Sequence, residues 1–335
     1  MPVPAGGPTQ GYIPLGRFIF LNILITGGAG FIGCNTARHH LDQGHRVVIF
    51  DNLSRQGALH NLRWLQGLGG DRVIVHQGDV RHASEVETAF ASRPDRIYHL
   101  AGQVAVTTSV TQPRDDFESN ALGTFNVLEA TRRHAPEALF IYSSTNKVYG
   151  EMSASEVVEQ ETRYTYRNLP HGIPETQPLD FHSPYGCSKG CGDQYVRDYA
   201  RIYGLRTVVM RQSCIYGTRQ FGVEDQGWIA HFCLAARARK PISIYGDGKQ
   251  VRDVLWIDDL IEAYECAARH SDQAVGEVFN IGGGPANTLS VWKEFGPLLN
   301  RHAGYEVDIR LGPWRPGDQR VYFSDIRKAQ RLLQW

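Results

Sequence analysis

Gly27-Gly-Ala-Gly30-Phe-Ile-Gly33 follows the apolar run Leu21-Asn-Ile-Leu-Ile-Thr26, and together they decide the fold of this chain. The run predicts a buried strand, and the residues from Phe31 to about Gly44 predict a helix. The three spaced glycines permit a tight turn, a close approach of the backbone to a pyrophosphate, and close helix–strand packing. The helix N-terminus offers N–H groups and a positive dipole end to phosphates. A lone glycine-rich turn would be an ordinary connection, but this strand–turn–helix setting predicts a dinucleotide site.

The next apolar run, Arg46-Val-Val-Ile-Phe50, ends in Asp51. An acidic residue about 20 positions past the glycines binds the hydroxyls of the adenine ribose. Its negative charge repels a 2′-phosphate, so NAD is favoured over NADP. Arg55 lies near enough in the sequence to weaken that preference.

Strands and helices alternate along most of the chain, which predicts an α/β fold with a Rossmann-type doubly wound parallel sheet. Ligands bind such a sheet at the carboxyl ends of its strands, where Asp79, Ala101, Gly102 and the run from Ser143 to Thr145 stand. We expect strands at 21–26, 46–50, 72–76, 96–100, 138–142 and 205–210, and helices at 31–43, 83–91, 115–134 and 185–203.

The elements shorten after residue 212, which indicates a smaller C-terminal substrate-binding region. We therefore expect an extension at 1–20, an NAD-binding Rossmann domain at 21–211 and a mainly substrate-binding region at 212–335. Residues 251–281 are expected to return to the Rossmann domain. A polar stretch at 151–183, too long for an ordinary connection, is expected to be a functional loop.

Composition excludes several classes of function. Lys plus Arg and Asp plus Glu balance at 35 each, so no overall field points to nucleic acid or to an anionic membrane. No apolar stretch is long enough to span a bilayer. The six cysteines show no metal-ligand spacing, and we expect no metal, six small buried thiols and a reducing cytoplasmic location.

Tyr185-Gly-Cys-Ser-Lys189 places a phenol and an ammonium four residues apart, on one face of a helix. The ammonium would favour the phenolate, so that tyrosine could act as a base near neutral pH. The alternative is a solvated helix surface, because this spacing is common by chance. The dinucleotide motif upstream favours the catalytic interpretation.

Several ordered motifs together resemble the extended short-chain dehydrogenase/reductases, in the branch of nucleotide-sugar epimerases. They are the glycine turn, His99-Leu-Ala-Gly102, Ser143-Ser-Thr145, Tyr185-x-x-x-Lys189, Arg252-Asp253 with Asp258-Asp259, and Arg315-Pro-Gly-Asp318. Within that branch the chain is similar to enzymes that invert C2 of CDP-linked sugars. This rests on Asp51-Asn-Leu-Ser-Arg55, Ser143–Gly150, Phe181–Lys189, Arg219-Gln-Phe221 with Asp225–Trp228, and Gly246–Val254.

The resemblance implies roles for individual residues. Tyr185 would be the acid/base, Thr145 would bind the reacting sugar oxygen, and Lys189 would lower the pKa of the tyrosine and hold the nicotinamide ribose. Thr145 could instead satisfy a strand end, and Arg252 could be a solvated charge. Tyr149 is expected to pack or touch substrate, and Asn120 to have a local role. The implied cofactor-binding residues are Gly27, Gly30, Phe31, Ile32, Gly33, Asp51, Asn52, Arg55, Asp79, Val80, Leu100, Ala101, Gly102, Tyr185 and Lys189; the implied substrate-binding residues are Gln103, Thr107 to Ser109, Thr145, Arg252 and Arg315.

One departure from related enzymes is informative. Sugar-nucleotide 4,6-dehydratases carry Asp-Glu after the Thr of Ser-Ser-Thr, where this chain has Asn146 and Lys147. An amide is a weak proton donor and an ammonium cannot act as a base, so dehydration loses both of its acid/base groups. The resemblance therefore implies NAD-dependent C2 epimerisation of a CDP-sugar through a transient 2-keto sugar. A UDP- or CDP-hexose 4-epimerase, a net NAD(P)H-dependent reductase and a non-catalytic NAD-sensing module are the competing hypotheses.

The resemblance also carries expectations about assembly and chain length. Helices at 115–134 and 185–203 match a pair that related enzymes pack across a two-fold axis, so we expect a homodimer or a homotetramer. Related enzymes continue with one more helix beyond the position of Trp335, so we expect a further helix to be missing here.

Overall fold

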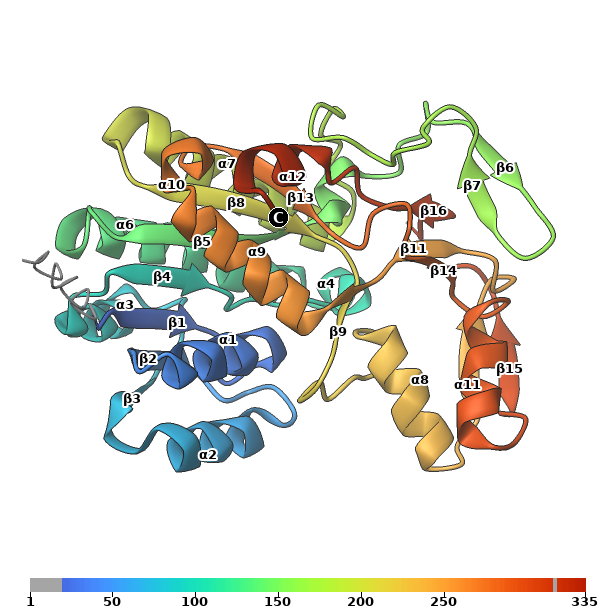
Figure 1. Cartoon of the computed structure of the whole chain (residues 1–335), viewed down its shortest axis with the longest axis horizontal. Coiled ribbons are helices and arrows are strands. Elements are labelled where there is room, and N and C mark those ends of the chain that lie inside the picture. Colours follow the sequence, from blue (N-terminus) through green and yellow to red (C-terminus); the bar gives the residue numbers. More distant parts are fainter. Residues whose placement is uncertain (1–19, 316–317) are drawn as a thin grey trace, which may run out of the picture.

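Seven strands, all paired in parallel, form the central sheet of the computed structural model, which describes residues 20–315 and 318–335. The strand order β13-β8-β5-β4-β1-β2-β3 reverses beside β1, the point where ligands bind in doubly wound sheets (Figure 1). The expected fold class is therefore confirmed. The strands are β1 (Asn22–Thr26), β2 (Arg46–Asp51), β3 (Val73–Gln77), β4 (Arg96–His99), β5 (Leu139–Thr145), β8 (Thr207–Gln212) and β13 (Val278–Ile281).

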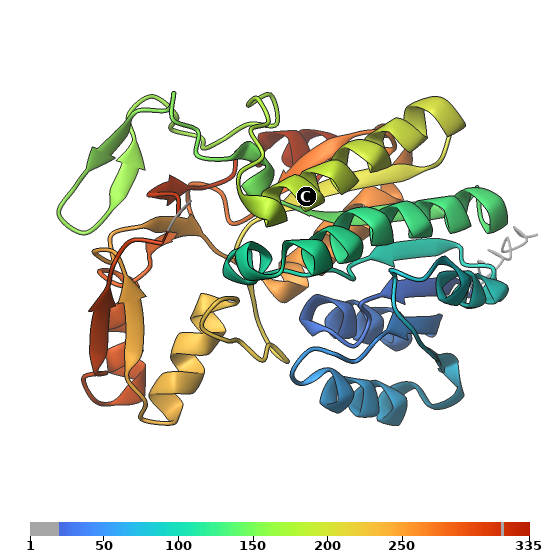
Figure 2. The same ribbon diagram turned by 180° about the vertical axis from the view of Figure 1, so that it is seen from behind.

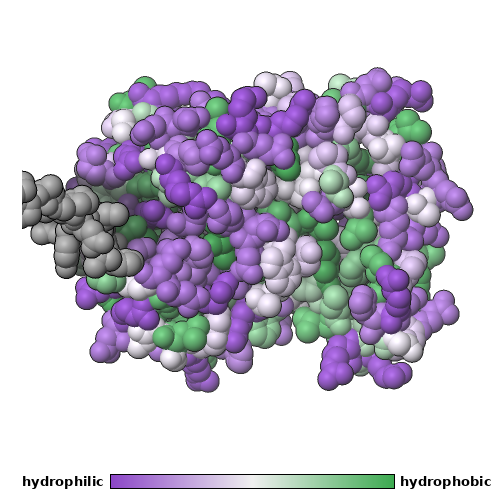
Figure 3. All heavy atoms as spheres, viewed as in Figure 1, coloured by the Kyte–Doolittle hydropathy of each residue, from purple (hydrophilic) through white to green (hydrophobic). Residues whose placement is uncertain are grey.

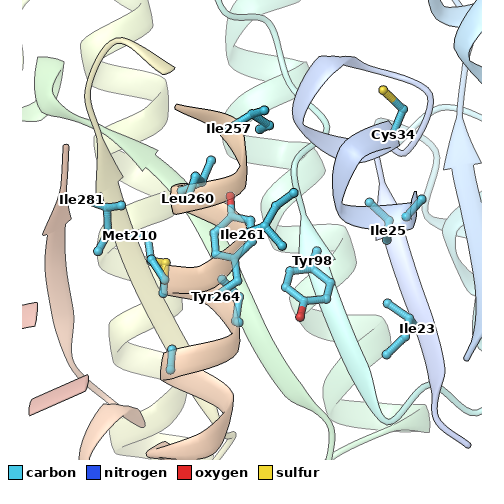
Figure 4. Packing of buried hydrophobic residues seen from close by; sticks show 14 of the residues in the cluster. Ile23, Ile25, Cys34, Tyr98, Met210, Ile257, Leu260, Ile261, Tyr264 and Ile281 are labelled. Carbon is cyan, nitrogen blue, oxygen red and sulfur yellow. The ribbon is translucent and has the colours of Figure 1, made fainter. Parts of the chain in front are cut away.

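Both faces of the sheet are buried, which explains why its strands read as continuous apolar runs. Along β1, Ile23 and Ile25 point into one helix layer and Leu24 into the other. Figure 4 shows the first layer, where Tyr98 of the sheet lies beside Tyr264 of helix α9. The first layer holds α1 (Phe31–Asp42), α2 (Ala58–Gly69), α9 (Ile257–Arg269) and α12 (Arg327–Leu333), and the second holds α3 (Ala83–Ala89), α6 (Gly123–His134) and α7 (Ser183–Tyr203), as Figure 2 shows from behind.

Several predicted boundaries differ from the observed ones. The helix expected at 115–134 is divided into α5 (Pro113–Phe117), a π-helical turn (Glu118–Leu122) and α6, and α4 (Val106–Thr111) precedes them. The strand expected at 205–210 is displaced by two residues, to β8. Helix α2 was missed, although Ala58, Leu62 and Leu65 are buried at helical spacing and would have indicated it.

Residues beyond β8 contribute to two regions (Figure 1). Strand β13 and helices α9, α10 (Ser271–Ala274) and α12 belong to the Rossmann layers, and the remainder forms small sheets and two helices beside them. These elements are β9 (Ile215–Tyr216) with β12 (Leu255–Trp256), β10 (Ile242–Tyr245) with β15 (Ile309–Gly312), β11 (Val251–Asp253) between β14 (Thr288–Ser290) and β16 (Val321–Tyr322), and helices α8 (Trp228–Arg237) and α11 (Phe295–Ala303).

The polar stretch at 151–183 contains a hairpin of β6 (Val157–Glu159) and β7 (Tyr164–Tyr166). Tyr164, Tyr166 and Ile173 pack in a separate apolar cluster with Val251 and Tyr322. The pockets that hold the candidate site residues take no lining residue from 151–182. The expected extension at 1–20 lies outside the described residues except for Phe20. Within the described residues, no helix has the length and apolarity needed to cross a membrane.

Candidate active site

A pocket of about 470 Å³ lies at the carboxyl ends of β1, β2 and β4. It brings together every expected cofactor-binding residue except Tyr185 and Lys189. The lining from the glycine turn and the two acidic positions comprises Gly27, Gly30, Phe31, Ile32, Gly33, Asp51, Asn52, Arg55, Asp79 and Val80, and β4 adds Leu100, Ala101 and Gly102.

The glycine turn fits a pyrophosphate for steric reasons. Gly27 has a φ of +69°, and a Cβ there would lie 2.7 Å from the backbone nitrogen of Ala101. A Cβ on Gly33 would overlap the carbonyl oxygen of Gly27 and lie 2.7 Å from the Cα of Gly28. The first-turn N–H groups of α1, including those of Phe31 and Ile32, have no acceptor within the helix. This concave, donor-rich turn suits the two phosphates of NAD.

Asp51 is held in place by the turn that it faces. Its Oδ2 accepts a hydrogen bond from the N–H of Ala29 at 3.0 Å, and its Oδ1 accepts one from the N–H of Leu53 at 2.7 Å. Burial raises the pKa of Asp51, and these two N–H groups oppose that effect. The carboxylate thus has a defined orientation and spare lone pairs for ribose hydroxyls. Arg55 Nη2 donates to Gln226 at 3.3 Å.

Asp79 and Asn52 form the far side of the same pocket. Asn52 Nδ2 donates to Asp79 Oδ2 at 3.0 Å, and Arg81 makes two side-chain hydrogen bonds to the same carboxylate. Burial acts to raise the pKa of Asp79, but the hydrogen bonds outweigh it and hold that pKa well below its usual range.

The expected catalytic residues Thr145 and Tyr185 line a second pocket, of about 200 Å³, which shares Phe31 and Ile32 with the cofactor pocket. The same two residues line a third pocket, of about 330 Å³, which continues toward Arg252 and Arg315. The three cavities form one passage from the glycine turn to the region around α8. In Figure 3 the surface is hollowed on this side, between the Rossmann layers and the elements around α8, and hydrophobic residues gather there.

Tyr185 is placed by the first turn of α7 and by a neighbouring helix. Its N–H donates to Ser109 Oγ at 3.1 Å, and Ser109 Oγ donates to the carbonyl oxygen of Val106. Burial raises the pKa of Tyr185 to about 12, while a hydrogen bond with Thr145 acts to lower it. The Tyr185 phenol and the Thr145 hydroxyl therefore meet in a dry site, where both can contact one sugar oxygen.

That Lys189 lowers the pKa of Tyr185 stays a prediction, and the position of Lys189 is as follows. Lys189 Nζ donates to the carbonyl oxygen of Ser143 at 2.5 Å and lies 4.3 Å from the ring centre of Tyr142. Burial lowers the pKa of Lys189 to about 7. Removal from water favours the neutral form of both the phenol and the amine. Lys189 lines none of the three pockets but touches Ser143, which lines two of them.

The two arginines expected to bind substrate, Arg252 and Arg315, both line the third pocket. Arg252 Nη2 donates to Asp318 at 2.6 Å, and Arg315 Nη2 lies 3.4 Å from Asp225. The Arg315 guanidinium also lies 3.8 Å from the ring centre of Tyr245. Each guanidinium keeps further N–H groups for an anion, because these contacts use only some of its donors.

Other expected contacts are placed differently. Gln103 lines the cofactor pocket rather than the third pocket, and its side chain bonds the backbone of Ala105 through both amide atoms. Thr107 lines the third pocket with a buried hydroxyl that has no partner among the described residues. Tyr149 is a packing residue, since it is buried and donates to Asn280 at 2.7 Å. Asn120 bonds the carbonyl oxygen of Gln103, which agrees with a local role.

Residues that the sequence analysis did not assign to the site also line the third pocket. They include Lys147, Glu224, Gln226, Trp228 and Tyr245. The run Asp225–Trp228 was named in the sequence analysis only because it resembles related enzymes. Its only local structural signal is Gly227, which has a φ of +78° and is the N-cap residue of α8.

The expectation of six buried cysteines is confirmed only for Cys34 and Cys266. Cys191 and Cys214 are half-buried, and Cys187 and Cys233 are exposed, so the expectation is wrong for these two; all six are free thiols. Among residues 20–315 and 318–335, no three potential metal ligands lie together.

Comparisons with known proteins place these features in context. Residues 23–282 match the NAD dependent epimerase/dehydratase family. The chain is 48% identical to CDP-paratose 2-epimerase from Salmonella typhi over 94% of each chain, and 34% identical to dTDP-glucose 4,6-dehydratase from Neisseria gonorrhoeae over 94% of this chain and 90% of that one. It is also similar to the solved structure of UDP-glucuronic acid 4-epimerase from Bacillus cereus with UDP-glucuronic acid and NAD, with a TM-score of 0.80, 27% identity, and coverage of 94% of this chain and 93% of that one.

Proposed function

The chain belongs to the NAD dependent epimerase/dehydratase family, and from this membership we propose that it inverts C2 of a CDP-linked sugar, converting CDP-paratose to CDP-tyvelose. The observation that carries the proposal is the 48% identity to a CDP-paratose 2-epimerase over 94% of both chains. The continuous passage from the glycine turn to Arg252 and Arg315 supports it, because it has room for a cofactor and a nucleotide sugar meeting at Tyr185.

In this proposal each residue of the passage has a defined task. NAD, bound at the glycine turn, supplies a hydride acceptor that also returns the hydride. Tyr185 removes the proton of the C2 hydroxyl, and Thr145 holds the same oxygen. Arg252 and Arg315 hold the diphosphate through forked charge-assisted hydrogen bonds while the 2-keto sugar turns within the site. The turned sugar presents its opposite face at C2, where bound NADH would supply the hydride, and Tyr185 returns the proton to the C2 oxygen, so that C2 is inverted.

The residues after Thr145 favour epimerisation over dehydration. Asn146 Oδ1 accepts a hydrogen bond from Thr145 at 3.3 Å, and Lys147 Nζ donates to Gln319 at 3.2 Å. Neither side chain is a carboxylic acid able to expel a hydroxyl group or a carboxylate able to remove a carbon-bound proton. The third pocket thus lacks acid/base groups for dehydration at the positions where dehydratases carry them.

The test follows the hydrogen at C2. Substrate deuterated at C2 should give product that keeps the label, and heavy water should introduce none there, because the hydride does not meet solvent. Proton NMR of the product should show inversion at C2 alone. Washout of the label would contradict the hydride mechanism, and inversion at C4 would contradict only the substrate assignment.

A hexose 4-epimerase is the second candidate, since the solved relative with UDP-glucuronic acid is a 4-epimerase. A panel of CDP- and UDP-sugars read by NMR separates the two by regiochemistry. The same panel distinguishes an epimerase from a net reductase, which would consume NAD(P)H stoichiometrically, and from an NAD-sensing module, which would turn over no sugar.

We further infer a homodimer, with a homotetramer as its extension. Phe117, Phe125, Tyr195 and Ile202, on α5, α6 and α7, are large apolar side chains left exposed. These lie on the two helical segments expected to pair across a two-fold axis. Light scattering at several concentrations tests this, and a monomer throughout would contradict it.

Free thiols at all six cysteines support a cytoplasmic location.

A further inference from the structure

Asp116 is a buried carboxylate that lines neither the cofactor pocket nor the sugar-binding passage. It lies on α5 with no exposed surface. Its Oδ2 accepts a hydrogen bond from Ser188 Oγ at 2.5 Å, and its Oδ1 accepts one from Asn120 Nδ2 at 3.1 Å. Within the residues that the structure describes, Asp116 forms no ion pair, in contrast to its neighbour Asp115, which lies 3.7 Å from Arg81. A buried charge without such a partner is costly, so its retention calls for a physical reason.

The partners of Asp116 connect the catalytic helix to the cofactor pocket. Ser188 lies between Tyr185 and Lys189 on α7, and its Oγ is also 3.2 Å from the carbonyl oxygen of Tyr185. Asn120 donates to the carbonyl oxygen of Gln103, which follows Gly102 in the loop after β4, at 3.1 Å. Asp116 thus joins the second turn of α7 to the loop that lines the cofactor pocket.

The second buried carboxylate near Lys189 has an ion-pair partner. Asp193, one turn further along α7, accepts hydrogen bonds from Arg211 Nε and Nη2, both at 2.8 Å. Ser144 Oγ also donates to Asp193 at 2.7 Å. The negative charge of Asp193 raises the pKa of Lys189.

The other titratable groups that face Lys189 are neutral. On β4, burial lowers the pKa of His99 to about 3, and on β5 burial raises the pKa of Tyr142 well above its usual value. On α7 itself, burial raises the pKa of Cys191 and of Tyr185. Asp193 and Asp116 are therefore the negative charges that act on Lys189 within the described residues, and of the two only Asp116 has no ion-pair partner there.

We propose that Asp116 is a positioning residue for the catalytic pair: its carboxylate ties α7 to the cofactor loop through Ser188 and Asn120, and its charge keeps the Lys189 amine protonated. Burial alone drives Lys189 toward the neutral amine. A negative charge in the same dry region opposes this. Burial raises the pKa of Asp116, while the Ser188 hydrogen bond and the charge of Lys189 act to lower it, so each charge opposes the effect of burial on the other.

The test measures the charge on Lys189 directly and needs no substrate, so its outcome is independent of the proposed function. Full-length protein with NAD is labelled with ¹³Cε-lysine and titrated by NMR. The signals arise from Lys147, Lys189, Lys240, Lys249, Lys293 and Lys328, and the one lost in Lys189→Arg identifies Lys189. In Asp116→Asn the pKa of Lys189 should fall by about one unit, the lower end of the effect of a nearby opposite charge.

Matched variants separate charge from shape. Asp115→Asn removes a neighbouring carboxylate that is exposed, and it should leave the pKa of Lys189 unchanged. Ser188→Ala breaks the tether but keeps the charge, so the pKa should stay near its wild-type value. Asp116→Ser removes the same charge with a smaller side chain, should Asp116→Asn fail to fold. An unshifted Lys189 in either Asp116 variant overturns the proposal, and so does failure of both to fold, which would assign Asp116 to the fold alone.

Discussion

Replacing Gly33 by alanine tests the steric basis of the cofactor site. The new Cβ would overlap the carbonyl oxygen of Gly27 and lie 2.7 Å from the Cα of Gly28, where ordinary contact begins at 3.4 Å. Both neighbours are backbone, so the turn must move by roughly 0.7 Å, the difference between the two distances. Overpacking of this kind costs about 1–3 kcal/mol, which lowers Tm by several degrees.

Gly33→Ala should impair NAD binding more than it impairs the stability of the fold. A misplacement of about 1 Å in a binding site can lower the reaction rate on the order of 10²-fold. Because the displaced turn must also match a pyrophosphate, we expect the affinity for NAD to fall at least about 10-fold. The assay measures NAD content of the purified protein and Tm with and without added NAD.

Gly67→Ala is the matched control, because a Cβ there would meet nothing within 4 Å in helix α2. It should stabilise the protein by about 0.5–1 kcal/mol and leave NAD content unchanged. Gly33→Ala protein with wild-type NAD content and Tm would refute the steric account of the turn.

Three further predictions address catalysis, stability and pH. Tyr185→Phe should fold and bind NAD but lose about 10²–10⁴-fold in turnover, measured by NMR of the sugar, and near-normal turnover would remove Tyr185 from the mechanism. Asp193→Ala leaves the buried Arg211 without its partner and should lower the free energy of unfolding, measured with urea, by about 3–5 kcal/mol. A decrease of less than about 1 kcal/mol would contradict a stabilising role of the Asp193–Arg211 pair. Burial lowers the pKa of Lys147 to about 8, so its positive charge is present below that pH and lost above it. Calorimetry should show CDP affinity falling as pH rises through about 8 in the wild-type protein but not in Lys147→Met, and parallel pH profiles would exclude Lys147 from substrate binding.

The local parts of the site could be predicted from sequence because their chemistry is contiguous. The turn from Gly27 to Gly33 and the acid at Asp51 follow their strands directly, and parallel strands bring their carboxyl ends to one edge. Gln103 could not be placed in this way. Its side chain folds onto the backbone of Ala105, a choice made by local hydrogen bonds that no sequence pattern specifies.

The charge states in the site depend on burial, which is a property of the assembled fold. Spacing alone placed Tyr185 and Lys189 on one helix face and predicted a stabilised phenolate. In the folded protein both groups lie out of water, and Lys189 turns to Ser143 and Tyr142 instead. Desolvation then moves the pKa of Tyr185 up and that of Lys189 down.

The sequence by itself determined the doubly wound sheet, the use of NAD and the proposed catalytic pair, because each depends on short-range periodicity or on a contiguous motif. Only the tertiary structure decided which distant groups surround that pair. Asp116 and Asp193 act on Lys189, and Arg211 pairs with Asp193, because packing of α5, α7 and β8 brings these charges into one region of low dielectric. The energy of an electrostatic interaction depends on the distance between the two charges and on their burial, and neither can be derived from the order of residues along the chain.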